Sequence, residues 1–270
     1  MKISFLGGGN MANALIGGMV KEGFAATDIR VVDPGADARA RLATTYAVNC
    51  MESADMLPEV GDLIVLAVKP QQMKEAVTPL VGRLGDAVVV SIAAGLDMAT
   101  LSRWLGGHRR IVRCMPNTPA LIGAGITGLC ALPEVSDDER TAAARVRRAV
   151  GTTVWIADEA MMDAVTAVSG SGPAYVFLFI EALEQAAAEL GLAPEQGRQL
   201  AIGTVQGAAA LAAQSPEPAS VLRERVTSKG GTTAAALDVM SEKGVREGIV
   251  SGVKAAEARG RELGRLLGAN

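Results

Sequence analysis

The chain has 270 residues, of which 49% are hydrophobic and 20% charged, a composition typical of a globular protein rather than a disordered one. At about 150 residues per domain, the length favours two domains. The net charge of -3 and the aromatic content of 3% argue against a nucleic-acid partner, because phosphate binding needs excess positive charge and base stacking needs aromatic rings. The single histidine, His108, and the dispersed cysteines Cys50, Cys114 and Cys130 lack the spacing of a zinc site. We therefore expect no metal and, from the odd cysteine count, free thiols in a reducing compartment.

The N-terminal segment is uncharged between residues 3 and 20 and superficially resembles a secretion signal. Its glycines and the polar residues Asn10 and Asn13 are too flexible and too polar for the apolar core of such a signal. The strongest other apolar stretch, residues 173–180, stops at Glu181 and falls short of the ~18 residues that a membrane span needs. We expect a soluble cytoplasmic protein with no membrane segment.

Short β-branched runs alternate with helical patterns over the first part of the chain, as in the βαβ units of a parallel sheet. The expected strands are residues 2–6, 29–32, 63–68, 87–92, 111–115, 128–132 and 153–156. The expected helices between them are residues 10–21, 36–45, 71–80, 99–105 and 137–150. This pattern predicts an α/β domain with a mainly parallel sheet over residues 1–157.

The remaining residues, 158–270, have no convincing strand and are rich in alanine. The expected helices are residues 159–168, 174–190, 194–214, 218–224, 232–243 and 245–267. Runs of small residues such as 203–210 permit close helix packing, and the alanine faces have little polar coverage. This pattern favours packing against a second subunit, and an ordinary monomeric helix bundle is the alternative.

A glycine motif follows the first expected strand, where residues 7–12 (GGGNMA) match G-x-G-x-x-A and lead directly into a helical pattern. Gly7 allows a tight turn, Gly9 lets the backbone approach a pyrophosphate, and the small Ala12 lets the helix pack on the strand. Asp33, at the end of the next expected strand, is the acidic residue that accompanies such a motif. Together these features predict binding of a dinucleotide.

A second glycine motif, residues 123–128 (GAGITG), is formally a better match to G-x-G-x-x-G. It follows a proline-bounded loop and leads into strand-like residues rather than a helix. We expect it to bind no nucleotide and to form a glycine-permissive bend between strands.

Asp33 leaves two interpretations open. Its carboxylate can accept a hydrogen bond from a ribose 2′-hydroxyl and repel a 2′-phosphate, which favours NADH. Alternatively, it can belong to a turn that caps the helix from Ala36, while Arg39 and Arg41 lie near enough to hold the phosphate of NADPH.

Two further glycine-rich segments stand before expected helices. Residues 169–173 (SGSGP) precede the helix at 174–190, and residues 227–233 (TSKGGTT) open the helix that follows them. Either segment can simply cap its helix, which is the commoner role of such residues. Their occurrence together beside a dinucleotide-binding domain favours an anionic substrate at one of these helix N-termini.

The chain resembles the pyrroline-5-carboxylate reductase family over essentially its whole length. The motifs that carry the resemblance, in the family's order, are FLGGGNMA (5–12), AVKP (67–70), SIAAG (91–95), RCMPNTPA (113–120), SGSGPAY (169–175) and TSKGGTT (227–233). The resemblance implies a Rossmann-type N-terminal domain that binds NADPH or NADH and an all-α C-terminal domain that forms an interlocked dimer, often within a ring of dimers. It also implies reduction of 1-pyrroline-5-carboxylate to L-proline, the last step of proline biosynthesis.

The resemblance further implies the roles of individual residues. It assigns to the coenzyme Gly7, Gly9, Asn10 and Met11 along the pyrophosphate, Ala67, Val68, Lys69 and Pro70 near the ribose and nicotinamide, and Asn117 beside the nicotinamide. It assigns to the substrate carboxylate and ring nitrogen Ser228, Gly231, Thr232 and Thr233. Lys229 receives no catalytic role, because some family members have proline there.

The implied reaction transfers a hydride from the nicotinamide to the C=N carbon while a proton reaches the nitrogen. An imine nitrogen is basic enough to be partly protonated beforehand, so positioning and exclusion of water can provide most of the catalysis. Thr233 is the candidate proton donor, directly or through water. His108 stands in a polar turn and is expected to be solvated.

Two rival functions remain. A β-hydroxyacid dehydrogenase joins similar domains but uses a catalytic lysine in the helical domain, and this chain has no lysine between Lys74 and Lys229. A catalytically silent NAD(P)-binding sensor would bind the coenzyme without oxidising it in the presence of substrate.

Overall fold

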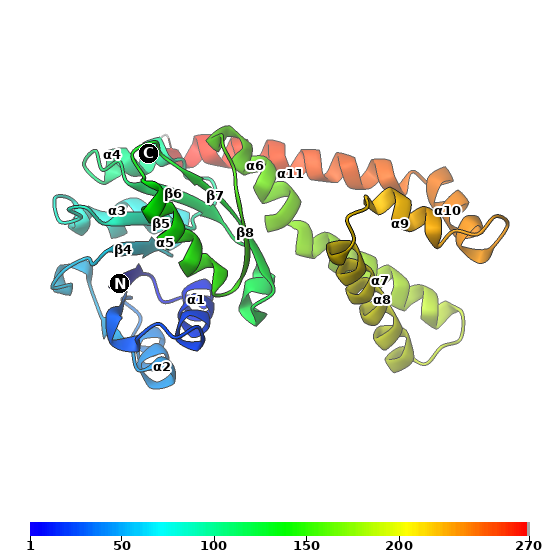
Figure 1. The fold of residues 1–270 in the computed structure, drawn as a ribbon, viewed down its shortest axis with the longest axis horizontal. Coiled ribbons are helices and arrows are strands. Elements are labelled where there is room, and N and C mark those ends of the chain that lie inside the picture. Colours follow the sequence, from blue (N-terminus) through cyan, green and yellow to red (C-terminus); the bar gives the residue numbers. More distant parts are fainter. Residues whose placement is uncertain (269–270) are drawn as a thin grey trace. The chain divides into compact units, whose positions relative to one another are not determined.

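The structure of the protein is a computed structural model that describes residues 1–268. The chain forms two compact units, which Figure 1 shows in sequence colours. The first contains Met1–Ser171 and the chain from Ala256 onward, and the second contains Gly172–Ala255.

These units do not coincide with the predicted division at residues 157 and 158. The segment after the last strand stays with the first unit because Met162 and Ala167 are buried there. The end of the last helix also belongs to that unit, where Arg103 Nη2 donates a hydrogen bond to the carbonyl oxygen of Gly268 at 3.0 Å. The change from strands to helices therefore precedes the boundary between the compact units.

One eight-stranded sheet forms the centre of the first unit. Its strands are β1 (Ile3–Leu6), β2 (Ile29–Val32), β3 (Asn49–Met51), β4 (Leu63–Leu66), β5 (Val88–Ser91), β6 (Ile111–Met115), β7 (Gly125–Ala131) and β8 (Gly151–Trp155), in the spatial order β3-β2-β1-β4-β5-β6-β7-β8. Every neighbouring pair is parallel except β6 with β7. The predicted α/β class with a mainly parallel sheet is thus confirmed.

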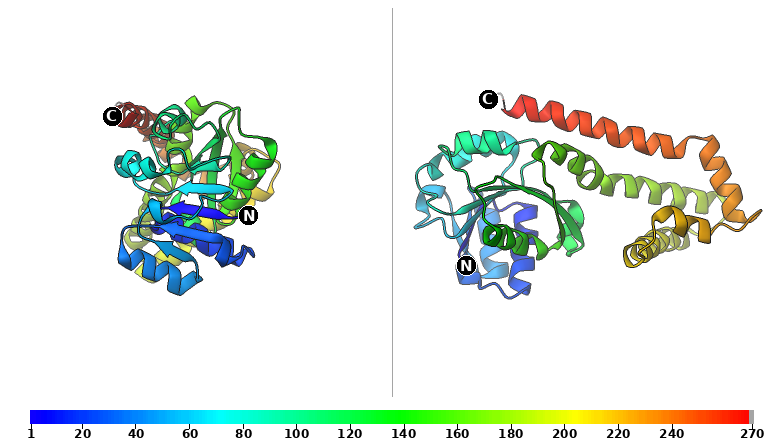
Figure 2. Two further views of the ribbon diagram at one scale, coloured as in Figure 1. Left: turned by 90° about the vertical axis from the view of Figure 1, so that its left-hand side faces the viewer. Right: turned by 45° about the horizontal axis from the view of Figure 1, so that its top comes forward.

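Helices cover both faces of this sheet (Figure 2). The helices of this unit before the boundary are α1 (Asn10–Lys21), α2 (Ala36–Tyr46), α3 (Met73–Val77), α4 (Met98–Trp104), α5 (Asp137–Arg148) and α6 (Met162–Val165). Ile3 and Phe5 of β1 pack with residues of α1 and α5, whereas Leu6 packs with residues of α3 and α4. Because side chains alternate along a strand, one short buried strand supplies both cores.

Two elements differ from the sequence prediction. β3 was not predicted, because its Asn-Cys-Met sequence is short and has no β-branched residue, yet it pairs with β2 in the register Val31 to Cys50. The helix predicted over 71–80 is broken into η3 (Pro70–Gln72), α3 and η4 (Thr78–Leu80). Pro79 lacks the amide hydrogen that a continuous helix would need there.

The second unit contains only helices, as predicted. They are α7 (Gly172–Glu189), α8 (Pro194–Gln214), α9 (Ala219–Arg225), α10 (Thr232–Glu242) and the first part of α11 (Val245–Gly268). No residue of α7 is buried, and α8 buries only Gly197 and Ala201. Phe177 and Leu178 are 58% and 67% exposed. One copy of this unit therefore leaves large apolar side chains uncovered.

By length and composition, the helical run Glu159–Glu189 is able to cross a membrane, and 6% of its most apolar window is buried. The run includes Glu181, so it does not contradict the expectation that no uninterrupted apolar stretch of ~18 residues occurs. A single helix of this kind is weak evidence for a membrane protein, because helices of soluble proteins can have the same properties.

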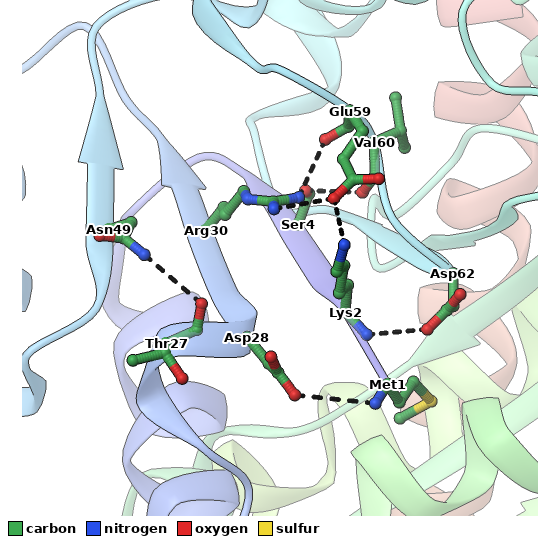
Figure 3. Close-up of polar contacts among 10 residues, drawn as sticks. All are labelled: Met1, Lys2, Ser4, Thr27, Asp28, Arg30, Asn49, Glu59, Val60 and Asp62. Atoms are coloured by element: carbon green, nitrogen blue, oxygen red, sulfur yellow. Dashed lines mark hydrogen bonds and ion pairs between the residues drawn. The ribbon is translucent and has the colours of Figure 1, made fainter.

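Polar contacts gather at the amino-terminal edge of strands β1 and β2 (Figure 3). Glu59 Oε1 lies 2.5 Å from Lys2 Nζ and 3.0 Å from Arg30 Nη2. The hydrogen bonds from Lys2 and Arg30 hold the pKa of Glu59 below its ordinary value. Ligands of open parallel sheets bind at the opposite, carboxyl-terminal edge, so this cluster is part of the scaffold.

Candidate active site

The glycine loop joins β1 to α1 at the carboxyl-terminal edge of the sheet. Gly7 has a φ of 102°, and a Cβ there would lie 2.7 Å from the carbonyl oxygen of Ala67. Gly9 is the N-cap of α1, and no side chain caps this helix. A Cβ on Gly9 would meet no protein atom within 4 Å. Gly7 is therefore needed by the fold, whereas the open space at Gly9, beside uncapped helix amides, fits a bound pyrophosphate.

A cavity of about 630 Å³ adjoins this loop. Among its lining residues are the predicted coenzyme ligands Gly7, Gly9, Asp33, Ala67, Val68 and Lys69. Asn10, Met11 and Pro70 are not among the lining residues, although Asn10 and Met11 form the first turn of α1. The cavity thus brings together six of the sequence-predicted positions from the ends of β1, β2 and β4.

Sequence reasoning missed several residues of this cavity. Glu52, Ser53 and Ala54 line it directly after β3, the strand that was not predicted. A strand predicted at residues 49–51 would have indicated these three residues, because the carboxyl ends of parallel strands lie at one edge of the sheet.

Asp33 forms the turn that the second interpretation expects, but no side chain caps α2, and the ribose contact stays a prediction. Its Oδ2 accepts a hydrogen bond from the Gly8 amide, and its Oδ1 accepts one from the Gly35 amide, both at 2.7 Å. Asp33 therefore fixes the glycine loop and the turn before α2, and it also lines the cavity. Arg39 and Arg41 are absent from the cavity lining.

Asn117 follows β6 and does not line this cavity. It is the N-cap of the short helix η5 (Thr118–Ile122), and its Oδ1 accepts a hydrogen bond from the Ile126 amide at 3.0 Å. This bond ties the loop after β6 to the beginning of β7.

The second glycine motif leads into a strand, as predicted. Gly123 ends η5 with a φ of 75°, and residues 125–131 form β7. The expected bend is limited to residues 123–124, because Gly125–Gly128 already belong to β7, and the motif leads into no helix.

The SGSGP motif has a different structure from the one expected. Residues 166–170 form a π-helical turn, η7, that continues α6 towards α7. The Ser171 amide donates to the Thr166 carbonyl at 2.8 Å, and the Ser169 hydroxyl donates to the Val165 carbonyl at 2.9 Å. The expectation of a loop with free amides and hydroxyls is therefore wrong, because hydrogen bonds to the preceding helical turn use these groups.

The TSKGGTT motif does open a helix. Gly231 is the N-cap of α10, which no side chain caps, and Gly230 has a φ of 72°. A Cβ on Gly231 would lie 2.4 Å from the Ser228 hydroxyl oxygen, so the loop is tightly folded. Thr232 and Thr233 form the first turn of α10, with Thr233 half-buried. The amides at this helix N-terminus can bind an anion.

The remaining titratable candidates are not among the residues that line the cavity. His108 is half-buried rather than solvated, with Nε2 3.0 Å from the Ala87 carbonyl oxygen, and burial lowers its pKa. Cys50, Cys114 and Cys130 are free, and burial raises the pKa of Cys114 to about 12. Within residues 1–268, no group of three or more His, Cys, Asp or Glu side chains is arranged to hold a metal ion.

The chain matches the family model described as pyrroline-5-carboxylate reductase dimerisation over residues 159–263. Residues 2–95 match the model described as NADP oxidoreductase coenzyme F420-dependent. The pyrroline-5-carboxylate reductase of Pseudomonas aeruginosa is 44% identical over 268 residues, which cover 99% of this chain and 98% of that protein. The chain belongs to the pyrroline-5-carboxylate reductase family. The resemblance carried by its six sequence motifs is thus confirmed.

Solved structures of this family share the whole fold. A pyrroline-5-carboxylate reductase from Coxiella burnetii has a TM-score of 0.92 and 38% identity, covering 97% of this chain and 98% of its own. A pyrroline carboxylate reductase from Plasmodium falciparum, solved with NADP bound, has a TM-score of 0.86 and 29% identity, covering 98% of both chains. This chain is thus an NAD(P)H-dependent oxidoreductase of the family.

Proposed function

We propose that this chain catalyses the final step of proline biosynthesis, the reduction of 1-pyrroline-5-carboxylate to L-proline with NADH or NADPH. The observation that carries the proposal is the similarity over nearly the full length to pyrroline-5-carboxylate reductases, including 44% identity to the Pseudomonas aeruginosa protein. The open position at Gly9, beside the uncapped N-terminus of α1, supports the coenzyme part of the proposal.

The coenzyme would be held at the carboxyl-terminal edge of the sheet. In this proposal the pyrophosphate would contact Gly7, Gly9, Asn10 and Met11, and Asp33 would contact the adenosine ribose. The second ribose and the nicotinamide would contact Ala67, Val68, Lys69 and Pro70, with Asn117 beside the nicotinamide. Bound NADH or NADPH would supply the hydride that reduces the C=N carbon. The free first-turn amides of α1 and its positive dipole end favour the charged pyrophosphate.

The substrate would be held by the loop at the start of α10. Ser228, Gly231 and Thr232 would bind the substrate carboxylate with the amides of this uncapped helix end. As the C=N carbon gains the hydride, the ring nitrogen gains a proton, which gives L-proline and oxidised coenzyme. The hydroxyl of Thr233 would donate a hydrogen bond or the proton to that nitrogen, directly or through one water.

A spectrophotometric assay tests the proposal. Addition of 1-pyrroline-5-carboxylate to the protein with NADH or NADPH is expected to lower the absorbance of the reduced coenzyme and to produce L-proline. Coenzyme binding without substrate-dependent oxidation would instead support a silent NAD(P)-binding sensor. Oxidation of a 3-hydroxy acid with NAD⁺ or NADP⁺, without imine reduction, would support a β-hydroxyacid dehydrogenase.

The role of Thr233 is tested by a pair of variants. Thr233→Ala is expected to lower kcat and to change the pH profile of turnover, because the nitrogen loses its hydrogen-bonding partner. Thr233→Ser keeps a hydroxyl and is expected to retain most of the activity. Unchanged turnover of Thr233→Ala across the pH range would remove Thr233 from the mechanism.

We further propose that the protein is a cytoplasmic homodimer, with a ring of dimers as the larger assembly. The exposed apolar side chains of α7 and α8, such as Phe177, Leu178 and Leu200 at 58%, 67% and 58%, support burial against a second copy. Light scattering is expected to give the mass of a dimer or a multiple of it, in buffer without detergent. Leu178→Glu should lower that mass, whereas Gln214→Glu, which adds the same charge, should not. Retention in the membrane fraction would contradict the cytoplasmic assignment.

A further inference from the structure

The charged side chains that line the nucleotide cavity are unevenly distributed. Among the described residues that line it, Asp33 follows β2, Glu52 follows β3 and Glu75 lies on α3, whereas the single cation, Lys69, follows β4. In the strand order β3-β2-β1-β4, Lys69 and Glu52 belong to strands three positions apart. At ~4.8 Å per strand, the carboxyl ends of β3 and β4 are about 14 Å apart. The end of the cavity at β2 and β3 therefore has carboxylates and no lining cation.

This acidic end is where the adenosine ribose would lie. With the pyrophosphate at Gly9, the acidic residue at the end of β2 is placed to meet the ribose 2′-hydroxyl. Amides of Gly8 and Gly35 hold the two Asp33 oxygens, each at 2.7 Å. A carboxylate oxygen has a second lone pair, so Asp33 can also accept a hydrogen bond from a hydroxyl.

The nearby arginines are already engaged. Arg39 Nη1 donates to the carbonyl oxygens of Asp33 and Pro34, both at 2.8 Å, and its Nη2 lies 3.7 Å from Glu52 Oε2. Arg41 Nη2 donates to the Gly8 carbonyl oxygen at 3.1 Å. Each guanidinium keeps further N–H donors, so it is the position in which these contacts hold it that disfavours binding of a 2′-phosphate. Neither arginine lines the cavity.

We propose that Asp33 and Glu52 make this chain selective for NADH over NADPH. A 2′-phosphate carries nearly two negative charges and would meet both carboxylates, whereas a 2′-hydroxyl can donate to Asp33. Glu52 acts in two ways, because its carboxylate lies at the cavity and also pairs with Arg39. The inference rests on the proposed function only in requiring that this cavity binds the coenzyme.

Calorimetric titration with unreactive coenzyme fragments tests the inference separately from catalysis. The wild-type protein is expected to bind ADP-ribose at least about tenfold more tightly than 2′-phospho-ADP-ribose at low salt, and this ratio should shrink as salt rises. Glu52→Gln should lower the ratio several-fold without affecting the fold, because the Glu52 side chain is 70% exposed. Asp33→Asn should lower it further, mainly by weakening ADP-ribose binding and removing the repulsion of the phosphate.

Glu134→Gln is the matched control. Glu134 is an exposed glutamate paired with Arg109 at 2.9 Å, and it does not line the cavity. Its substitution removes the same charge and should leave the binding ratio unchanged. The ratio of kcat/KM for NADH to that for NADPH should follow the binding ratio in all variants.

Three results would overturn the inference. One is equal or tighter binding of 2′-phospho-ADP-ribose by the wild-type protein, in line with the NADP bound to the Plasmodium falciparum relative. The second is an unchanged ratio in both Asp33→Asn and Glu52→Gln. The third is failure of both fragments to bind, which would also refute coenzyme binding at this cavity. Fragment binding without imine reduction would leave this inference standing and refute only the proposed reaction.

Discussion

The side-chain oxygen Oδ1 of Asn117 accepts a hydrogen bond from the backbone amide of Ile126 at 3.0 Å. This bond joins the loop after β6 to the first residues of β7, which runs antiparallel to β6. Asn117 therefore positions the loop in which it lies, while its amide nitrogen and the second lone pair of Oδ1 can still bind another group.

Asn117→Ala is expected to lower kcat about tenfold, because loss of the bond lets the loop move relative to the coenzyme. The loss of stability should stay near 1 kcal/mol, the usual net value of one hydrogen bond. Asn117→Asp keeps an oxygen acceptor for Ile126 and should fold as well as the wild type. Steady-state kinetics and urea unfolding of both variants measure these effects. Wild-type kcat in Asn117→Ala would show that this loop does not position the nicotinamide.

Alanine is expected to affect mainly the stability of the fold at Gly7 and mainly the binding of the coenzyme at Gly9. Gly7→Ala should destabilise the fold by about 1–3 kcal/mol, because Gly7 has a φ of 102° and its Cβ would lie 2.7 Å from the Ala67 carbonyl oxygen. Gly9→Ala should cost the free protein no more than about 1 kcal/mol, because a Cβ there has no clash and only the preference for glycine over alanine at the N-cap is lost.

The same Gly9→Ala variant should bind NADH at least about tenfold more weakly, because the added methyl group occupies the space for the pyrophosphate. Thermal unfolding without ligand and coenzyme titration separate the two effects. Wild-type coenzyme affinity in Gly9→Ala would show that the pyrophosphate does not lie over this residue.

The sequence predicts this loop well because each of its requirements is local. A buried strand, a glycine with positive φ and a helix that starts without a side-chain cap are consecutive, so their order in the chain indicates the structure. The contacts of Asp33 with Gly8 could not be predicted in the same way. They join residues 25 positions apart, and they depend on how the turn after β2 lies against the glycine loop.

The SGSGP segment shows a second limit of local reasoning. Serine and glycine normally favour helix ends, but tertiary packing keeps residues 166–170 helical. A Cβ on Gly170 would lie 2.6 Å from Met115 Cε, and one on Gly128 would lie 2.6 Å from Val165 Cγ1. These glycines allow the helical segment to approach β6 and β7 closely. Their spacing in the sequence alone does not distinguish this role from a loop.

His108 provides a pH test of stability. Burial lowers its pKa below the ordinary 6.5, so the folded protein binds a proton less readily than the unfolded chain. Stability should therefore be complete above the ordinary pKa and should fall as the pH decreases from there towards the lowered folded-state pKa. His108→Gln can still donate a hydrogen bond to the Ala87 carbonyl oxygen, but it has no group that titrates in this range. The variant should therefore lack this part of the fall in stability on acidification.

Thermal unfolding of the wild type and His108→Gln at pH 7.5 and pH 5.5 measures the difference. Because His108 is the single histidine of the chain, no other imidazole contributes to the comparison. A wild-type protein that loses no more stability on acidification than the variant would contradict the direction of the pKa shift.

Arg147 is a buried cation with incomplete hydrogen bonding. Its exposure is 0%, and its Nη2 donates to the Thr127 hydroxyl at 3.4 Å. In the part of the chain that the structure describes, Nε and Nη1 have no hydrogen-bond partner. Burial lowers the pKa of Arg147, because the charged form loses its hydration without a carboxylate to replace it. The guanidinium should therefore cost folding free energy.

Arg147→Met keeps much of the side-chain volume and removes this charge, so it is expected to stabilise the protein by about 1–3 kcal/mol. Arg147→Lys keeps the charge and should give no such gain, which separates the effect of charge from that of volume. Urea unfolding should show a higher midpoint for Arg147→Met with an unchanged m-value. A lower midpoint for Arg147→Met would mean that the hydrogen bonds of the guanidinium outweigh its desolvation, and that α5 depends on Arg147 for its attachment to β7.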